Sequence, residues 1–124
     1  MGVRAIRGAV TVENNSASDI IGETKALLTK MAEKNRLVEE DIISIIFTMT
    51  EDLNAAFPAI AARQLGWNSA ALMCMREIDV PGSLNKCIRV MMHINTDKTS
   101  KEINHVYLKD ARVLRPDLAD KQET

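Results

Sequence analysis

Four arginines lie in largely apolar segments of this 124-residue sequence, and they are the residues best suited to chemistry. A guanidinium keeps its charge in proteins, so each buried arginine needs an acidic partner or an anionic ligand. Its planar set of donors matches carboxylate and phosphate groups. Few acids are placed to neutralise the set, so it predicts a site for a small anion. The arginines are Arg7, Arg63, Arg89 and Arg115, in company with Tyr107 and Glu77.

Arg89 is the clearest case, because residues 86–94 form a short apolar run between Gly82 and Asn95. Such a run is typical of a β-strand. Alternation puts Arg89 on one face and Ile88 and Val90 on the other. Both faces are mostly apolar, which predicts a central strand covered on both sides. Either an acidic neighbour or an anionic ligand then compensates Arg89, and the run itself leaves both alternatives open.

Other kinds of site find little support in the sequence. His93 and His105 lack the spacing of a metal-binding pair, and no metal site is predicted. Glycine-rich phosphate loops and the GxSxG motif are absent. Cys74 could act as a nucleophile, but no sequence feature places a histidine beside it. A lone strand cysteine is more often a small apolar filler.

Composition excludes several classes of protein. With 46% hydrophobic and 27% charged residues, the chain is expected to form one globular domain over residues 1–118, followed by a polar, mobile tail over 119–124. A net charge of −1 and 3% aromatic residues argue against nucleic-acid binding. No apolar run approaches a membrane span. Two cysteines without a targeting segment predict free thiols and a cytoplasmic protein.

The elements that would position these residues alternate along the chain. Ser16 is expected to cap a helix that ends near Asn35, and a short helix over 59–65 follows Pro58. Gly8 interrupts the first strand, as at a bulge or a close approach of another backbone. The first two strands and the helix between them predict a βαβ unit with parallel pairing, and the third strand is expected beside the Arg89 strand. The predicted strands are 3–13, 42–49, 70–75, 86–94 and 105–108.

Several blocks of the sequence resemble the small monofunctional bacterial chorismate mutases of the trimeric, barrel-like class. The resemblance covers about residues 3–118, in order and with few length changes. Because several blocks agree together, it is specific. The blocks are Arg4-Ala5-Ile6-Arg7-Gly8-Ala9-Val10-Thr11-Val12-Glu13, Cys74-Met75-Arg76-Glu77-Ile78-Asp79-Val80, Lys86-Cys87-Ile88-Arg89-Val90-Met91-Met92, His105-Val106-Tyr107-Leu108 and Val113-Leu114-Arg115-Pro116-Asp117-Leu118.

The resemblance implies an α+β fold with a mixed five-stranded sheet, one long helix and a short second helix. Three subunits would join their sheets into a pseudo α/β barrel, with active sites in the clefts between neighbours. The implied enzyme is an isomerase of the shikimate pathway to aromatic amino acids. It would convert chorismate to prephenate by a pericyclic Claisen rearrangement, in the cytoplasm. No cofactor, metal, membrane or nucleic acid is implied.

The family pattern also implies roles at the reacting centre. Arg89 would place its charge at the ether oxygen of chorismate and touch a carboxylate. Arg7 and Tyr107 resemble the family's carboxylate clamp. Glu77 and the Cys74 thiol resemble the groups that hold the ring hydroxyl, with Glu77 also balancing charge. Arg89, Glu77 and Cys74 are thus the expected catalytic residues.

The remaining site residues would form an apolar wall and a cationic mouth, and two positions depart from the family pattern. Ile60 occupies a place where a lysine often adds positive charge, so capture of the dianion would depend more on the other arginines of the mouth. Pro81 stiffens a turn that is usually more flexible. The implied wall is Phe57, Ala59, Met73 and Leu114, and the implied mouth is Arg63 and Arg115.

Two other interpretations keep the architecture and change the function. Trimeric enamine/imine deaminases have a similar sheet and an arginine that grips a carboxylate, but their acidic, proline-containing C-terminal signature is absent. A non-catalytic sensor of small anions would bind a carboxylate ligand without turnover. Following the absorbance of added chorismate separates all three.

Overall fold

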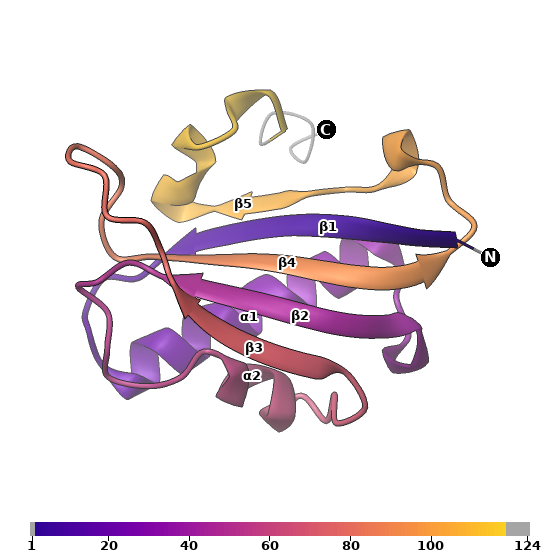
Figure 1. Cartoon of the computed structure of the whole chain (residues 1–124), viewed down its shortest axis with the longest axis horizontal. Coiled ribbons are helices and arrows are strands. Elements are labelled where there is room, and N and C mark those ends of the chain that lie inside the picture. Colours follow the sequence, from indigo (N-terminus) through magenta and orange to yellow (C-terminus); the bar gives the residue numbers. More distant parts are fainter. Residues whose placement is uncertain (1, 119–124) are drawn as a thin grey trace.

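Residues 2–118 of the chain, described by a computed structural model, form one mixed five-stranded sheet and two α-helices (Figure 1). The predicted α+β class, mixed sheet, long helix and short helix are confirmed. The predicted mobile tail, 119–124, lies outside the described residues. In chain order the elements are β1 (Gly2–Thr11), α1 (Ala17–Asn35), β2 (Ile42–Met49), α2 (Ala59–Gln64), β3 (Ala71–Arg76), β4 (Cys87–Thr96) and β5 (Val106–Leu108), with 3₁₀ turns at Glu39–Asp41, Ser100–Glu102 and Lys109–Val113.

The strand β4 lies at the centre of the sheet, whose order is β3-β2-β4-β1-β5. It pairs antiparallel with β1 and with β2, while β3 is parallel to β2 and β5 is parallel to β1. Two predicted pairings are therefore wrong: β1 does not pair with β2, and β3 does not neighbour β4. Both predictions joined strands that are close in sequence. In the structure β4 lies between β1 and β2 and pairs with both, and β2 lies between β3 and β4.

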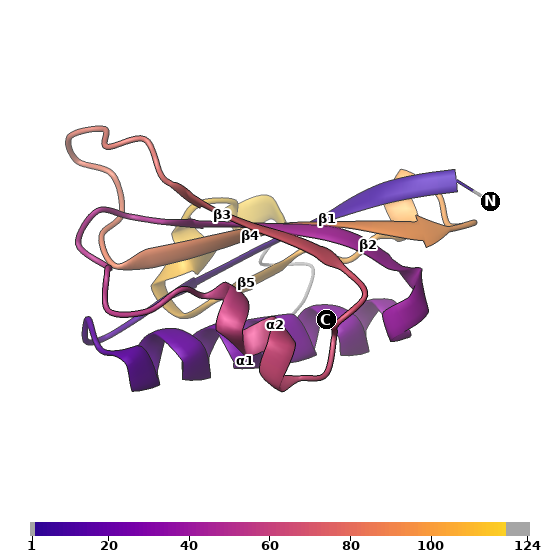
Figure 2. The ribbon, with the colours of Figure 1, turned by 60° about the horizontal axis from the view of Figure 1, so that its bottom comes forward.

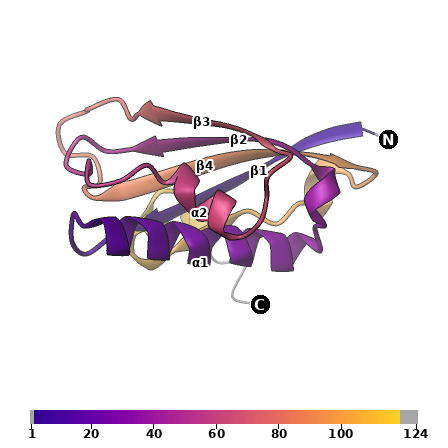
Figure 3. The same ribbon diagram turned by 90° about the horizontal axis from the view of Figure 1, so that it is seen from below.

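Both helices lie on the same side of the sheet (Figures 2 and 3). The Ser16 side chain caps α1 by accepting the Asp19 backbone N–H at 3.1 Å, as the sequence predicts. Asn35 is the last helical residue, and Arg36 follows in the left-handed conformation at φ 52°. The short helix α2 begins after Pro58 and ends at Gln64.

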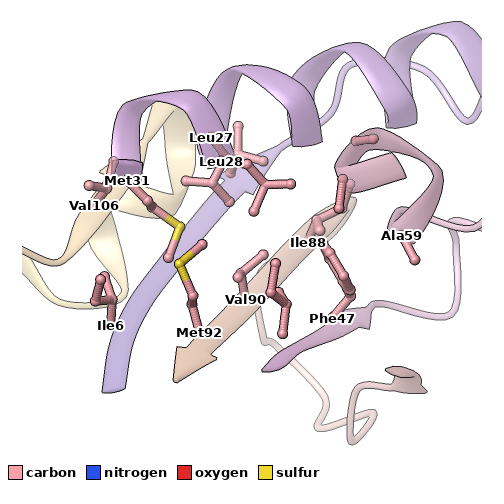
Figure 4. Close-up of a cluster of buried hydrophobic side chains, with 14 of the residues drawn as sticks. Ile6, Leu27, Leu28, Met31, Phe47, Ala59, Ile88, Val90, Met92 and Val106 are labelled. Atoms are coloured by element: carbon pink, nitrogen blue, oxygen red, sulfur yellow. The ribbon is translucent and has the colours of Figure 1, made fainter. Parts of the chain in front are cut away.

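The main hydrophobic core lies between this side of the sheet and the helices (Figure 4). Leu27, Leu28 and Met31 of α1 pack toward side chains of the sheet that include Ile88 and Met92, and all five are fully buried. These positions on β4 are the apolar alternation that the sequence predicts.

Residues 2–118 leave the opposite side of the sheet largely uncovered, so the predicted coverage of β4 on both faces is wrong for this part of the chain. Met91, two residues from Arg89, is 41% exposed, and Met73 of β3 is 57% exposed. One end of this side is covered within the described residues, where Tyr107 and Cys87 form a second small buried cluster with Ala9 and Ala111. The physical reason is that one long and one short helix cover only one face of a five-stranded sheet.

Gly8 lies in β1 without a bulge, since the pairing of β1 with β4 is continuous from Gly2 to Thr11. The close approach at Gly8 comes from a helix side chain rather than from another backbone. A Cβ at Gly8 would lie 2.5 Å from Sδ of Met31 and 3.2 Å from Cδ1 of Leu27. The absent side chain therefore allows α1 to pack closely on β1.

We expect Gly8→Ala to lower the free energy of unfolding by about 1–3 kcal/mol, because Met31 must leave its packed position. Urea unfolding followed by circular dichroism measures this change. Gly22→Ala is the matched control, since nothing lies within 4 Å of a Cβ at this position in α1. It should stabilise the chain by about 0.5–1 kcal/mol. Equal effects of the two substitutions would contradict the packing argument.

Candidate functional site

Four of the predicted site residues line one hollow of about 290 Å³ on the uncovered side of the sheet. They are Arg7 of β1, Arg89 of β4, Tyr107 of β5, and Glu77, which directly follows β3. The four come from segments that are up to 100 residues apart in sequence. The sheet order brings them together, because β4 lies directly between β1 and β2.

Arg89 is not buried in the chain, so the argument from the cost of burying its charge does not apply. Its side chain is 51% exposed, and its Nε lies 3.4 Å from Oε2 of Glu77 in an ion pair. Within residues 2–118, the Arg89 side chain makes no other hydrogen bond or ion pair. The acidic partner therefore exists, yet the two terminal Nη groups stay available to an anion.

The backbone holds Arg7 between two strands. Arg7 faces Met91 of β4 in the ladder, and its N–H donates to Nδ1 of His105 at 2.9 Å. The parallel pairing of β1 with β5 begins at the next residue, Gly8, opposite Val106. The hydrogen bond to the His105 ring therefore extends the contact between these two strands by one residue. A histidine that the sequence left without a role therefore fixes the strand that carries Arg7.

Tyr107 is buried at the edge of the hollow, with 5% of its surface exposed. Burial raises the pKa of its phenol, against the opposing effect of the Arg7, Arg115 and Arg89 charges. The phenol therefore keeps its proton at neutral pH and can donate a hydrogen bond to an anion.

A carboxylate anchors the start of β4, two residues before Arg89. Both oxygens of Asp52 accept the Lys86 N–H, at 3.1 and 2.9 Å, and Oδ1 also accepts the Thr50 hydroxyl at 2.5 Å. Thr50 in turn accepts the Cys87 N–H at 3.0 Å. This network holds Lys86 at φ 48°, a conformation that few side-chain-bearing residues adopt.

A second group of predicted residues lies apart from the hollow. Phe57 and Cys74 line a larger cavity of about 640 Å³ beside β3, on the helix side of the sheet, together with Ile60. Cys74 packs toward the main core, so a single chain does not bring it together with Glu77 on one face. Arg63 is exposed on α2, three residues after Ile60, which lines this cavity.

The other predicted residues are distributed around these two spaces. Met73 of β3 is exposed on the uncovered side, whereas Ala59 is 4% exposed and belongs to the core. Leu114 packs against the small cluster that contains Tyr107. Arg115 is already paired, because its Nη2 and Nε lie 3.1 and 3.2 Å from the two carboxylate oxygens of Asp117. This pairing raises the pKa of Arg115 and lowers that of Asp117.

Sequence reasoning missed Thr48, whose hydroxyl donates to Oε2 of Glu77 at 2.5 Å. A signal for it was present: Thr48 interrupts the apolar run of β2 at a position that alternation places on the Arg89 side. The anchoring residue Asp52 was missed as well, because it lies in a loop whose partner is 34 residues away.

Two general findings concern residues 2–118. No group of three or more histidines, cysteines, aspartates and glutamates in this range could hold a metal ion. No helix in the same range has both the length and the apolar character needed to cross a bilayer.

Comparisons with known proteins agree on one family. A family model described as chorismate mutase type I matches residues 3–118. The chain is 48% identical to chorismate mutase AroH of Bacillus subtilis (strain 168) over 120 residues, which are 96% of this chain and 94% of that protein. It is 49% identical to chorismate mutase AroH of Thermus thermophilus over 121 residues, 97% and 99% of the two chains. A solved chorismate mutase structure from Clostridium thermocellum is 70% identical, with a TM-score of 0.88 over 89% of this chain and 98% of that one.

We expect Cys87 to resist alkylation in the folded protein. Burial raises the pKa of its thiol to about 11, with Arg89 opposing and Glu77 adding to the shift. At pH 8, iodoacetamide should therefore modify Cys87 on the order of a hundredfold more slowly than in the urea-unfolded chain, where a thiol pKa is about 8.5. Peptide mass spectrometry over time measures the two rates. Equal rates in both states would show that Cys87 is accessible and ionised.

Proposed function

This chain belongs to the type I chorismate mutase family, and we propose that it converts chorismate to prephenate at a site built around Arg7, Glu77, Arg89 and Tyr107. The observation that supports this site most directly is that the four side chains line one hollow on an uncovered sheet face. The reaction needs only binding, orientation and electrostatic stabilisation from the protein, and these residue types supply all three.

The charge balance of the hollow suits a dianion. Two arginines and one glutamate contribute to it, so its formal charge is positive even after the ion pair between Arg89 and Glu77. We assign Arg7 and the Tyr107 phenol to one substrate carboxylate, since both carry donors that match its oxygens. The raised pKa of Tyr107 supports this assignment, because the phenol keeps its donor proton.

The rearrangement breaks a carbon–oxygen ether bond while it forms a carbon–carbon bond, so negative charge grows on the ether oxygen. We assign the Nη groups of Arg89 to this oxygen. A fixed cation there stabilises the transition state more than the ground state, which is the requirement for catalysis. Glu77 is assigned to the ring hydroxyl and to balancing the charge of Arg89 before substrate binds.

Assembly into a homotrimer would complete the site. Large apolar side chains are exposed on the Arg89 side of the sheet, among them Met73, Met75 and Met91. A patch of this kind is typical of a protein interface. Phe57 and Cys74 line a different cavity from Arg89 in the same chain, and we propose that they reach the Arg89 hollow of a neighbouring subunit. Three sheets would then form the pseudo α/β barrel.

The mouth of the proposed site is less positive than in the family pattern. Ile60 replaces a lysine that is frequent there, and Arg115 is paired with Asp117. Arg63 then remains as the main cation for attracting chorismate. We further propose that the enzyme acts in the cytoplasm, as a step of the shikimate pathway to aromatic amino acids.

We expect Arg89→Ala to lower kcat on the order of 10³-fold while the fold persists, because the transition-state charge loses its cation. Loss of chorismate absorbance gives the rate, and circular dichroism checks folding. Arg4→Ala is the matched control: it removes an exposed guanidinium at the other end of β1 and should leave kcat unchanged. Near-normal turnover with the neutral isostere citrulline at position 89 would refute the electrostatic role. A protein that bound chorismate without converting it would be a sensor instead.

Mixing two inactive variants tests whether neighbouring subunits share each site. Arg89→Ala removes the cation from the half of the site that one subunit supplies. Phe57→Asp places a negative charge against the dianion from the half that the neighbouring subunit supplies. After joint refolding of a 1:1 mixture, random assembly should restore about a quarter of wild-type activity, because one site in four then combines two intact halves. Sedimentation velocity should show a trimer throughout. Recovery of no activity, or an active monomer, would contradict a shared site.

A further inference from the structure

The Thr48 hydroxyl has a specific place beside the proposed site. Thr48 lies opposite Arg89 in the antiparallel ladder and opposite Met75 in the parallel one. Glu77, just beyond β3, is held to the same strand by its N–H, which donates to the Met49 carbonyl at 2.9 Å. Backbone pairing therefore brings Thr48, Glu77 and Arg89 side by side.

One carboxylate oxygen of Glu77 serves both neighbours. Oε2 accepts the Thr48 hydroxyl at 2.5 Å and lies 3.4 Å from Nε of Arg89. The first contact has the length of a charge-assisted O–H to carboxylate hydrogen bond, and the second is longer than an ordinary one. Thr48 thus binds the carboxylate more closely than the arginine does.

This geometry has a consequence for Arg89. Carboxylates and guanidinium groups prefer to pair through two parallel hydrogen bonds, which would occupy at least one Nη group. With Oε2 bound to Thr48, the carboxylate meets Arg89 only at Nε. Within residues 2–118, both Nη groups then remain without a carboxylate partner and are available to an anion.

We propose that Thr48 is a positioning residue of the enzyme: its hydroxyl holds Glu77 in the orientation that leaves the Nη groups of Arg89 available. The proposal rests on the assignment of Arg89 and Glu77 to the site. In a purely structural role, by contrast, the Thr48 hydroxyl would only make a hydrogen bond that stabilises the fold, with no effect on Arg89.

The test compares Thr48→Val, which keeps the shape and removes the hydroxyl, with Thr48→Ser, which keeps the hydroxyl. We expect Thr48→Val to lower kcat on the order of tenfold, with a smaller change in KM, because Glu77 then competes for Arg89 in the transition state. Thr48→Ser should stay within about threefold of the wild type. Unchanged kcat in Thr48→Val, or equal losses in both variants, would overturn the proposal.

Thr24→Val controls for loss of a buried hydroxyl elsewhere. The Thr24 hydroxyl donates to the Ile20 carbonyl at 2.6 Å within α1, which lies on the opposite side of the sheet from the site. This variant should lose stability in urea unfolding but keep the wild-type kcat. A kcat loss in Thr24→Val as large as that in Thr48→Val would show that both effects are structural.

A double-mutant cycle with Glu77→Gln separates this proposal from the site assignment itself. If Thr48 acts through Glu77, Thr48→Val should change kcat less than threefold in the Glu77→Gln background. A further tenfold loss there would overturn the positioning role. If Glu77→Gln and Arg89→Ala both kept wild-type kcat, the site assignment would fail. If both were impaired while Thr48→Val was not, only the role of Thr48 would fail.

Discussion

Two helices cover one face of this five-stranded sheet, and the proposed chemistry lies on the other face. Main-core residues such as Phe47 and Met92 alternate along their strands with Thr48 and Met91 on the opposite side. The same period of two that builds the core therefore exposes a row of polar and apolar side chains. A chain that covered both faces would bury Arg89 and leave no room for an anion, so the incomplete covering of the sheet makes the site possible.

The open face also explains why one chain holds only part of the proposed site. Arg7, Glu77, Arg89 and Tyr107 supply donors and charge, whereas Phe57 and Cys74 line the other cavity, on the helix side of the sheet. Two exposed methionines, Met75 and Met91, line the same hollow as Arg7 and Arg89, and exposed apolar side chains of this kind are a liability for an isolated subunit. Association would bury these methionines and at the same time dehydrate the hollow, which strengthens each interaction between charges inside it.

Local features of the fold could be predicted from the sequence, and its non-local pairings could not. The cap at Ser16, the end of α1 at Asn35 and the start of α2 after Pro58 depend on neighbours in sequence, and the structure confirms them. The order of the strands depends on contacts between residues up to 98 apart, as between Ala9 and Tyr107, so β1 and β2 were wrongly predicted as partners. Arg89 shows the same limit at the site. Its strand was predicted, but neither its exposure nor the hydroxyl next to its acidic partner follows from the run of residues around it.

The loop between Glu77 and Lys86 is closed at both ends by hydrogen bonds to the end of β2 and the loop after it. The Glu77 N–H binds the Met49 carbonyl at one end, and the Lys86 N–H binds the Asp52 carboxylate at the other. Pro81 and Gly82 form the exposed tip of the loop, whereas Leu84 packs against the small cluster that contains Tyr107 and Cys87. A change confined to this exposed tip would leave both hydrogen-bonded ends in place, and with them the start of the strand that carries Arg89.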